Sequence, residues 1–177
     1  MRGRSGRLWG HAPHIDGDSG LISSVRNCTR AVRGGTSNGT GSATPLFAAA
    51  AFNRRGDVLC AVSQHGQIFA LFVTQNRYEI IKHVGISPTS VVASPTRSFE
   101  FLVGFADGSV RCFDVGAVRE VCTLSGHKSA VTHVDVSRSS DMALSASRDA
   151  VILWNTATWQ RVRVLGGGVG VAQAAFV

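Results

Sequence analysis

Long apolar runs are missing from this chain of 177 residues. No run approaches the ~18 consecutive apolar residues of a membrane-spanning helix, so the sequence predicts no membrane span. The N-terminal residues are basic, as in a signal peptide, but they are not followed by the apolar stretch of about 7–15 residues that secretion requires. We therefore expect a cytoplasmic protein.

Cysteine is scarce, and its spacing excludes a common class of metal site. The chain has Cys28, Cys60, Cys112 and Cys122, with no C-x-x-C pair of the kind that zinc frameworks use. Cys60 and Cys112 lie in apolar, strand-like runs, where a thiol behaves as a small hydrophobic side chain. We expect reduced cysteines, as in cytosolic proteins, with no metal site and no cofactor.

Motifs of nucleotide-binding and hydrolytic enzymes are also absent. The glycine-rich stretch 165–170 has neither the G-x-G-x-x-G order nor the lysine of a P-loop, and we interpret it as a flexible connector. No G-x-S-x-G nucleophile elbow occurs. No helical periodicity extends over about 11 residues, which disfavours βαβ folds. These absences favour an all-β protein that is not an enzyme.

Basic charge is concentrated near the N-terminus. Residues 1–55 carry eight arginines and two aspartates, a net charge of +6, whereas residues 56–177 carry ten basic and nine acidic residues, a net charge of +1. The second part has no basic face with interleaved aromatic residues, as nucleic-acid binding would require, so we disfavour direct nucleic-acid binding. We expect residues 1–45 to form a basic, Gly/Ser/Arg-rich leader that is partly flexible.

What the chain does contain is an internal repeat. His65, Asp107 and Asp149 stand in similar stretches at steps of 42 residues, which is within the roughly 40–45 residues of a four-stranded propeller blade. In the middle unit, Asp107 and Gly108 supply the tight hairpin turn between the second and third strands. A β-sandwich would not require a constant step of this kind. The repeat therefore predicts an all-β propeller.

The expected strands follow from short apolar runs bounded by polar turns. They cover 46–53, 58–63, 68–73, 78–84, 90–96, 99–106, 110–115, 120–124, 130–137, 141–147, 151–155 and 161–165, with a further first strand over 169–177. The corresponding blades are 46–84, 90–124, 126–165 and a partial 169–177. About three blades do not close a ring of typically four to eight, so we expect an incomplete arc that needs further blades in cis, or a partner, to close.

The unit 126–165 carries the marks of a known family. Gly126 and His127 precede its first strand, Ser147 and Asp149 flank the turn after its second strand, and Trp154 closes its third strand. This unit resembles the WD40 repeat. The resemblance implies that His127, Ser147, Asp149 and Trp154 form a structural hydrogen-bonded network. A hydrolase triad is the alternative, and we disfavour it because the serine would lie within a β-strand.

The other two units depart from the family pattern. Phe105 stands in the serine place and Phe113 in the tryptophan place of the middle unit, while the first unit has His65 for the aspartate and Leu71 for the tryptophan. Without the polar network, these blades must depend on apolar packing, worth roughly 25 cal/mol per Å² buried. The sequence therefore predicts a divergent propeller.

A second resemblance covers most of the chain. It is similar to the N-terminal propeller of a WD-repeat protein of the TBC-domain family over the stretches 101–114, 125–131, 153–155 and 158–161, with 6–9 and 18–22 in the leader. This resemblance implies a protein-binding scaffold, an adaptor of the centrosome, centriolar satellites or cilium. The regulatory region of a Rab GTPase-activating protein and a WD40 adaptor of RNA processing or of a ubiquitin ligase stay open as alternatives. All three imply other proteins as partners and no small-molecule substrate.

Overall fold

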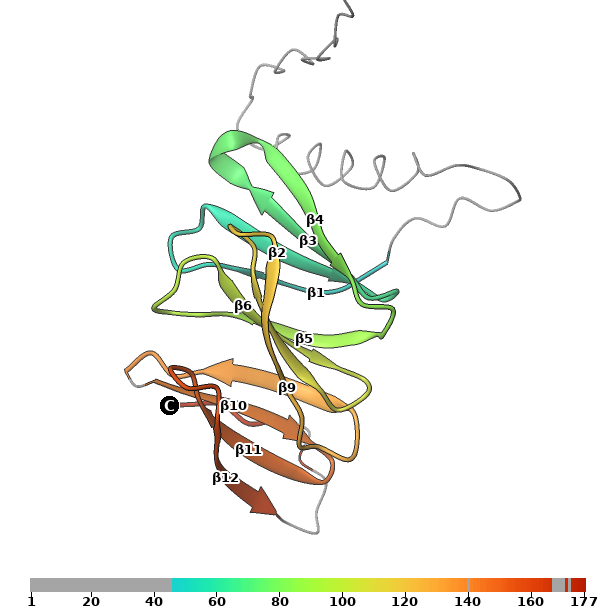
Figure 1. The fold of residues 1–177 in the computed structure, drawn as a ribbon, viewed down its shortest axis with the longest axis vertical. Helices are drawn as coiled ribbons and strands as arrows, with labels where there is room; N and C mark the ends of the chain where they lie inside the picture. Colours follow the sequence, from blue (N-terminus) through green and yellow to red (C-terminus); the bar gives the residue numbers. More distant parts are fainter. Residues whose placement is uncertain (1–45, 140, 167–170, 172) are drawn as a thin grey trace, which may run out of the picture. The chain divides into compact units, whose positions relative to one another are not determined.

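Twelve short β-strands make up the described part of the chain. A computed structural model describes residues 46–139, 141–166, 171 and 173–177, and Figure 1 labels its strands. The expected leader 1–45 and most of the connector 165–170 lie outside the described residues. The strands are β1 (Phe47–Phe52), β2 (Val58–Ser63), β3 (Gln67–Phe72), β4 (Arg77–His83), β5 (Pro88–Ala93), β6 (Glu100–Phe105), β7 (Val110–Asp114), β8 (Arg119–Leu124), β9 (Val131–Val136), β10 (Met142–Ser147), β11 (Ala150–Asn155) and β12 (Arg161–Gly166), with a short 3-10 turn η2 (Val73–Gln75).

These strands form three antiparallel sheets of four strands each. The orders are β1-β2-β3-β4, β5-β6-β7-β8 and β12-β11-β10-β9, so every strand pairs with its neighbour along the chain. None of the three sheets closes on itself within the described residues. The expected all-β architecture of about three four-stranded blades is thereby confirmed.

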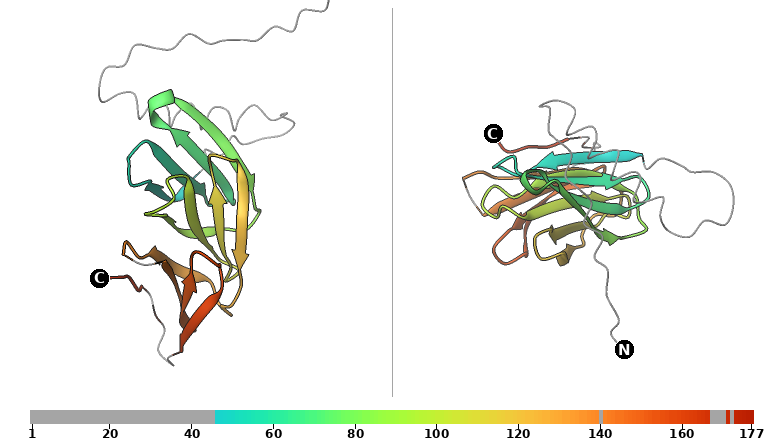
Figure 2. Two further views of the ribbon diagram at one scale, coloured as in Figure 1. Left: turned by 60° about the vertical axis from the view of Figure 1, so that its left-hand side comes forward. Right: turned by 90° about the horizontal axis from the view of Figure 1, so that it is seen from above.

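Neighbouring sheets pack through their apolar faces. The first strands β1, β5 and β9 lie side by side, and Figure 2 shows the three sheets following one another in chain order. One buried cluster joins the first and second sheets, and another joins the second and third. Strand alternation supplies both, because successive side chains of a strand point to opposite faces of its sheet.

Strand β6 shows this alternation most clearly. Phe101, Val103 and Phe105 belong to the cluster against the first sheet, whereas Leu102 belongs to the cluster against the third. All four side chains are buried. A strand that is apolar on both faces is typical of a sheet covered on both sides, so the middle sheet is the most deeply packed of the three.

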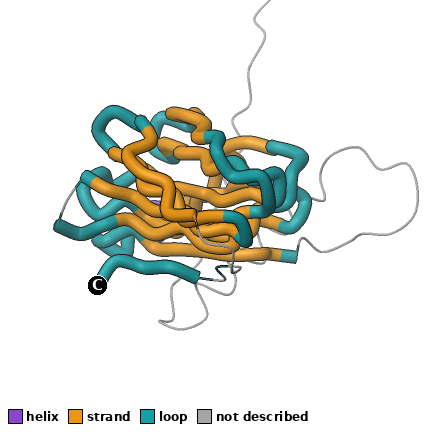
Figure 3. Tube along the Cα trace, turned by 90° about the horizontal axis from the view of Figure 1, so that it is seen from below, coloured by secondary structure: helices purple, strands orange, loops and turns teal. Residues whose placement is uncertain are grey.

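The loops gather at the two ends of the strands (Figure 3). The antiparallel order puts the loops 53–57, 94–99 and the described residues 137–139 at one end, together with the turns after the third strands. We call this the Asn53 end. The loops 64–66, 106–109 and 148–149 lie at the opposite end with the connections between sheets, and we call it the Asp107 end.

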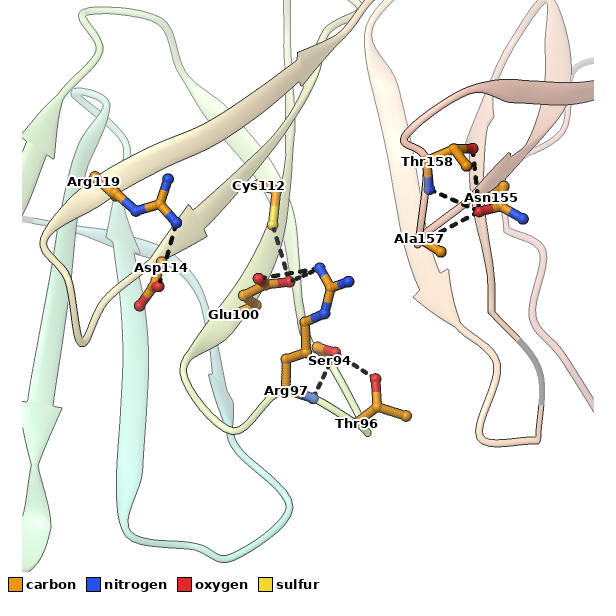
Figure 4. A network of polar contacts seen from close by, with 10 residues as sticks. All are labelled: Ser94, Thr96, Arg97, Glu100, Cys112, Asp114, Arg119, Asn155, Ala157 and Thr158. Carbon is orange, nitrogen blue, oxygen red and sulfur yellow. Dashed lines mark hydrogen bonds and ion pairs between the residues drawn. The ribbon is translucent and has the colours of Figure 1, made fainter.

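Two turns at the Asn53 end use the same device. The Asp114 carboxylate accepts hydrogen bonds from the amides of Gly116 and Ala117, both at 3.0 Å. The Asn155 side-chain oxygen accepts from the amides of Ala157 and Thr158, both at 2.9 Å, as Figure 4 shows. Short polar side chains favour turns through bonds of this kind, which explains why β7 and β11 end at these residues.

Most strands begin and end within one residue of the expected bounds, but β5 does not. It runs from Pro88 to Ala93 instead of over 90–96. Proline is compatible with the first position of a strand. At the other end the Ser94 hydroxyl accepts a hydrogen bond from the amide of Arg97 at 3.2 Å, which closes a turn over residues 94–97 and ends the strand. In the expected strand over 169–177, the described residues 171 and 173–177 carry no strand; Phe176 instead donates its amide to Asp135 of β9 at 2.8 Å.

Candidate functional site

The third sheet carries a continuous chain of five hydrogen-bonded residues. The Trp154 indole Nε1–H donates to Ser145 Oγ at 2.8 Å, and Ser145 Oγ lies 2.7 Å from His127 Nε2. On the other side of the imidazole, Ser147 Oγ lies 2.8 Å from Nδ1 and donates to the Asp149 carboxylate. The chain thus runs across β11 and β10 to the loop that precedes β9.

The carboxylate end sets the direction of the bonds around the imidazole. A carboxylate can only accept, so the Ser147 hydroxyl gives its single proton to Asp149 and its oxygen accepts the Nδ1–H of His127. In a neutral imidazole protonated on Nδ1, Nε2 accepts. The Ser145 hydroxyl then donates to Nε2, while its oxygen accepts the indole N–H of Trp154.

The surroundings favour these protonation states. Burial lowers the pKa of His127, and the Asp149 charge opposes this shift only in part. Hydrogen bonds from Ser129 and Ser147 hold the pKa of the Asp149 carboxyl well below its usual range. Desolvation penalises a charged imidazole, whereas donated hydrogen bonds stabilise a carboxylate. A neutral histidine and an ionised aspartate are the consistent pair near neutral pH.

Asp149 also pins the connection between the second and third sheets. Its carboxylate accepts the Ser129 hydroxyl at 2.6 Å and the amides of Lys128 and Ser129, both at 3.2 Å. Three donors of one loop thus converge on a single carboxylate of the 148–149 turn, and charge-assisted bonds of this kind are stronger than neutral ones. The loop is held against the sheet at the Asp107 end.

The structure brings the four residues His127, Ser147, Asp149 and Trp154 together, but through a fifth residue that the sequence analysis missed. Trp154 reaches His127 only by way of Ser145. The available signal was the spacing within β10, because residues 145 and 147 face the same side of a strand, where each can bond one of the two imidazole nitrogens.

The order of the bonds differs from that of a hydrolase triad. In a triad, the aspartate orients the histidine and the histidine takes the proton of the serine. Here Ser147 gives its proton to Asp149 and accepts one from His127, so it has no free base. Ser147 is also fully buried. This arrangement suits a structural role and leaves no exposed nucleophile among these residues.

The predicted turn at Asp107 and Gly108 connects β6 to β7 and packs against the loop that precedes β9. Asp107 Oδ1 accepts the amide and hydroxyl of Ser109 at 2.9 and 2.7 Å. Gly108 has φ +83°, and a Cβ at this position would lie 2.8 Å from the carbonyl oxygen of His127. Only glycine permits both the left-handed backbone and the close approach. The middle sheet therefore abuts the loop that carries His127.

A cavity of about 530 Å³ lies at the Asn53 end. The first strands of all three sheets line it, together with the loops that follow them. Arg54 and Arg138 border it, and both are exposed. Neither forms an ion pair with another residue in the part of the chain that the structure describes. Asp135 also borders the cavity, and its carboxylate already accepts hydrogen bonds from the amides of Val136 and Phe176 at 2.9 and 2.8 Å.

The described residues contain neither a metal-ligand cluster nor a membrane-spanning helix. Within 46–139, 141–166, 171 and 173–177, no cluster of three or more His, Cys, Asp or Glu residues is placed to bind a metal ion. Over the same residues, no helix is long and apolar enough to span a membrane.

Comparisons with known proteins agree with this architecture. The family "WD domain, G-beta repeat" matches residues 118–155. TBC1 domain family member 31 of Xenopus tropicalis is 32% identical over 175 residues, which cover 98% of this chain and 15% of that protein. Human Pre-mRNA-processing factor 19 is 32% identical over 94 residues, 49% of this chain and 19% of that one.

Among solved structures, the crystal structure of RRP9 WD40 repeats has a TM-score of 0.66 and 18% identity, covering 77% of this chain and 42% of that one. At this identity the likeness shows the fold alone. The chain spans about 15% of the length of the TBC1 relative. The family match and the similar relatives confirm the expected recognition of WD40 repeats. Propellers of this kind are typically non-catalytic platforms for protein interactions.

Proposed function

We infer that this chain, a WD40-repeat protein similar in sequence to TBC1 domain family member 31, is a protein-interaction scaffold in an adaptor of the centrosome or cilium. The sequence resemblance along 98% of the chain supports this assignment. The chain covers 15% of that relative, so the proposal concerns protein binding by the WD40 repeats alone. A cytoplasmic location at centrosomes, centriolar satellites or the cilium base belongs to the same proposal.

The observation that carries the scaffold role is the gathering of loops at the two ends of three packed sheets (Figure 3). Binding residues are commonly placed on loops that a rigid scaffold positions. At the Asp107 end, Asp149 holds the loop before β9 through three donors. At the Asn53 end, the Asn53 side chain donates to the Ser98 carbonyl oxygen at 3.0 Å and ties the loops of the first two sheets together.

We assign partner binding to the cavity at the Asn53 end. It offers two exposed guanidinium groups, Arg54 and Arg138, on opposite sheets. Arginine presents a planar fork of donors that matches a carboxylate, and the apolar side chains of Phe52 and Val92 line the same cavity. The fitting ligand is a protein segment that carries Asp or Glu next to an apolar residue.

Proximity labelling tests the proposal. The full chain fused to a biotin ligase is expected to label centrosomal and ciliary proteins above a ligase-only control. Labelling that is confined to other compartments would contradict the centrosomal assignment. It would not contradict the scaffold role, which is tested separately by comparing partner binding of arginine variants at the two loop ends.

A second candidate is an adaptor in RNA processing. The similarity to Pre-mRNA-processing factor 19 favours it, as does the net charge of +6 on residues 1–55. Phosphate contacts make RNA affinity fall steeply with salt. A gel-shift titration of the chain with single-stranded RNA at several salt concentrations separates the candidates, because the scaffold assignment predicts no binding at physiological salt.

A further inference from the structure

Cys112 of β7 and Cys122 of β8 stand directly opposite each other. They are register partners in the antiparallel pair, so their side chains lie on the same face of the sheet. Directly opposite residues have Cα atoms about 4.5 or 5.5 Å apart. Both values fall within the roughly 4.4–6.8 Å that a disulfide spans. The backbone therefore presents the two thiols at a separation that a disulfide can bridge.

The two cysteines differ in their access to solvent. Cys112 is fully buried, whereas Cys122 is partly exposed, and both are free thiols. A β-bulge follows the pair, because Phe113 pairs with Glu120 and leaves Val121 without a register partner. The bulge lies on the outer strand of the middle sheet. An oxidant can therefore reach Cys122 but not Cys112.

A carboxylate stands beside the buried thiol. Cys112 Sγ donates to Glu100 Oε2 at 3.9 Å, and Arg97 holds the same carboxylate through two bonds at 3.0 and 3.2 Å, as Figure 4 shows. The Glu100 side chain is only 13% exposed. Glu100 is thus placed to take up the proton of Cys112.

The pKa shifts of the two thiols also assign them different roles. The neighbouring Cys112 thiol lowers the pKa of Cys122, against the effect of its partial burial. The neighbouring Cys122 sulfur raises the pKa of Cys112, and burial and the Glu100 charge raise it further. Because the thiolate is the reactive form of cysteine, Cys122 is the attacking group and Cys112 the resolving one.

We propose that Cys112 and Cys122 are a redox modification site that forms a reversible intrachain disulfide with hydroperoxides. The Cys122 thiolate attacks a peroxide oxygen, the O–O bond breaks, and the leaving alkoxide takes a proton to become an alcohol, leaving a sulfenic acid on Cys122. The Cys112 sulfur attacks the Cys122 sulfur while its proton passes by way of Glu100 to the leaving oxygen. The S–S bond forms, the S–O bond breaks, and the leaving oxygen departs as water.

Overall, two thiols and one hydroperoxide give one disulfide, one alcohol and one water. A dithiol reductant returns the pair to the free thiols by exchange. The modification joins β7 to β8 covalently where the ladder is interrupted by the bulge.

Cys60 is the built-in control. It is fully buried, burial raises its pKa to about 12, and its register partners are Ala51 and Ala70. It has neither a thiol opposite it nor access to the oxidant. The proposal therefore expects Cys60 to stay reduced under conditions that oxidise the Cys112–Cys122 pair.

Peptide mapping of the full chain tests the site. The folded protein is treated with hydrogen peroxide, its remaining thiols are alkylated, and it is digested with trypsin, which cleaves after Arg111, Arg119 and Lys128. The expected product is a disulfide that links peptide 112–119 to peptide 120–128, with alkylated Cys60, and treatment with a dithiol removes it. Oxidation of Cys122 to sulfinic acid without the linked pair, or linkage of Cys122 to another cysteine, would overturn the proposal.

Two variants separate the roles within the pair. In Cys112→Ser, a dimedone probe is expected to trap a sulfenic acid on Cys122, whereas Cys122→Ser leaves Cys112 as a thiol. Glu100→Gln should slow the resolving step and increase the trapped sulfenic acid in a protein that keeps both cysteines. An unchanged amount of trapped acid in Glu100→Gln contradicts the assigned proton acceptor, and oxidation of Cys112 in Cys122→Ser contradicts the order of attack. Because wild-type mapping needs no variant, misfolding of a variant does not remove the test.

Discussion

Trp154 and Asp149 are joined by one unbroken relay of hydrogen bonds, although their side chains never touch a common partner. The relay passes through Ser145, His127 and Ser147. Its single direction requires a neutral imidazole between two serine hydroxyls. The third sheet and the loop that precedes it are therefore stabilised as a unit, and this coupling is measurable.

The link between Trp154 and Ser145 is tested by a double-mutant cycle. Trp154→Phe removes the indole donor but leaves the Ser145 hydroxyl bonded to His127. Ser145→Ala removes the acceptor and leaves the buried indole N–H without a partner, at a cost of about 1–3 kcal/mol. The double variant should lose less than the sum of the two single losses. Denaturant unfolding gives the three values. Trp159→Phe, a tryptophan packed at the edge of the same cluster, controls for loss of ring area, and strict additivity would refute the relay.

The neutral state of His127 predicts a pH dependence. Because burial lowers its folded-state pKa, the unfolded chain, with a histidine pKa of about 6.5, binds more protons in the window just below that value. Stability should be constant above about pH 6.5 and fall as pH decreases through the window. His127→Gln should flatten this dependence.

The comparison is the difference in unfolding free energy between wild type and His127→Gln as pH is lowered from about 8 to 5. All other histidines are the same in both proteins, so the difference reports on His127 alone. A difference that grows as pH falls would show that the protonated imidazole is the stabilising form.

Asp149 predicts a second loss at lower pH. Its lowered folded-state pKa means that its stabilisation is present above the unfolded value of about 3.9 and is lost as pH falls below it. Asp149→Asn keeps the shape but removes the charge that holds the amides of Lys128 and Ser129. Hydrogen exchange at these two amides should accelerate in the variant, while exchange in β6 stays unchanged. Equal acceleration in both places would indicate general destabilisation instead.

Gly108 and Gly56 form a matched pair. Both have a positive φ, +83° and +73°, but a Cβ at Gly108 meets the carbonyl oxygens of His127 and Ser129, whereas nothing lies within 4 Å at Gly56. Gly56→Ala should cost about 1–2 kcal/mol of backbone strain. Gly108→Ala should cost about 1–3 kcal/mol more, because the backbone of the loop that precedes β9 must move to accommodate the added Cβ. Equal losses in thermal or denaturant unfolding would show that the turn does not press on that loop.

Phe105 tests whether the middle blade depends on packing alone. It occupies the place that Ser147 has in the third blade, 42 residues earlier, and it is fully buried. Phe105→Ser restores the family residue but removes a large buried ring, so it should cost at least about 3–5 kcal/mol. Phe105→Leu, which keeps apolar volume, should cost much less. A serine that is tolerated as well as leucine would show that a polar network can form there.

The constant step predicted the three sheets, because identical steps in a repeat bring equivalent strands to equivalent places. His127, Ser147, Asp149 and Trp154 were instead implied by the resemblance of one unit to the WD40 repeat. Ser145 was missed since the family pattern names one serine and the strand face offers two. The same step would have identified Arg54 and Arg138, which are separated by twice its length. That they border one cavity could be seen only once the first strands were packed side by side.

The pairing of Cys112 with Cys122 could not be read from spacing. Counting back from the pair Asp114 and Arg119 without a bulge would place Val121, and not Cys122, opposite Cys112. The register shift between Cys112 and Phe113 places Cys122 there instead. The shift of β5 has a different, local origin, since the bond from the Arg97 amide to the Ser94 hydroxyl ends that strand early. Register and bulges depend on the neighbouring strand, and a single run of residues does not contain that information.

The most direct test of the scaffold role is the binding of partner proteins by loop-end variants. The chain Arg54→Ala/Arg138→Ala is compared with wild type and with Arg148→Ala, which removes an exposed arginine at the opposite Asp107 end. All three are first matched for folding by their unfolding midpoints and then compared by quantitative proximity labelling. The account predicts that the double variant loses a defined set of wild-type partners while Arg148→Ala keeps them. Retention of every partner by the double variant would contradict the assigned binding site.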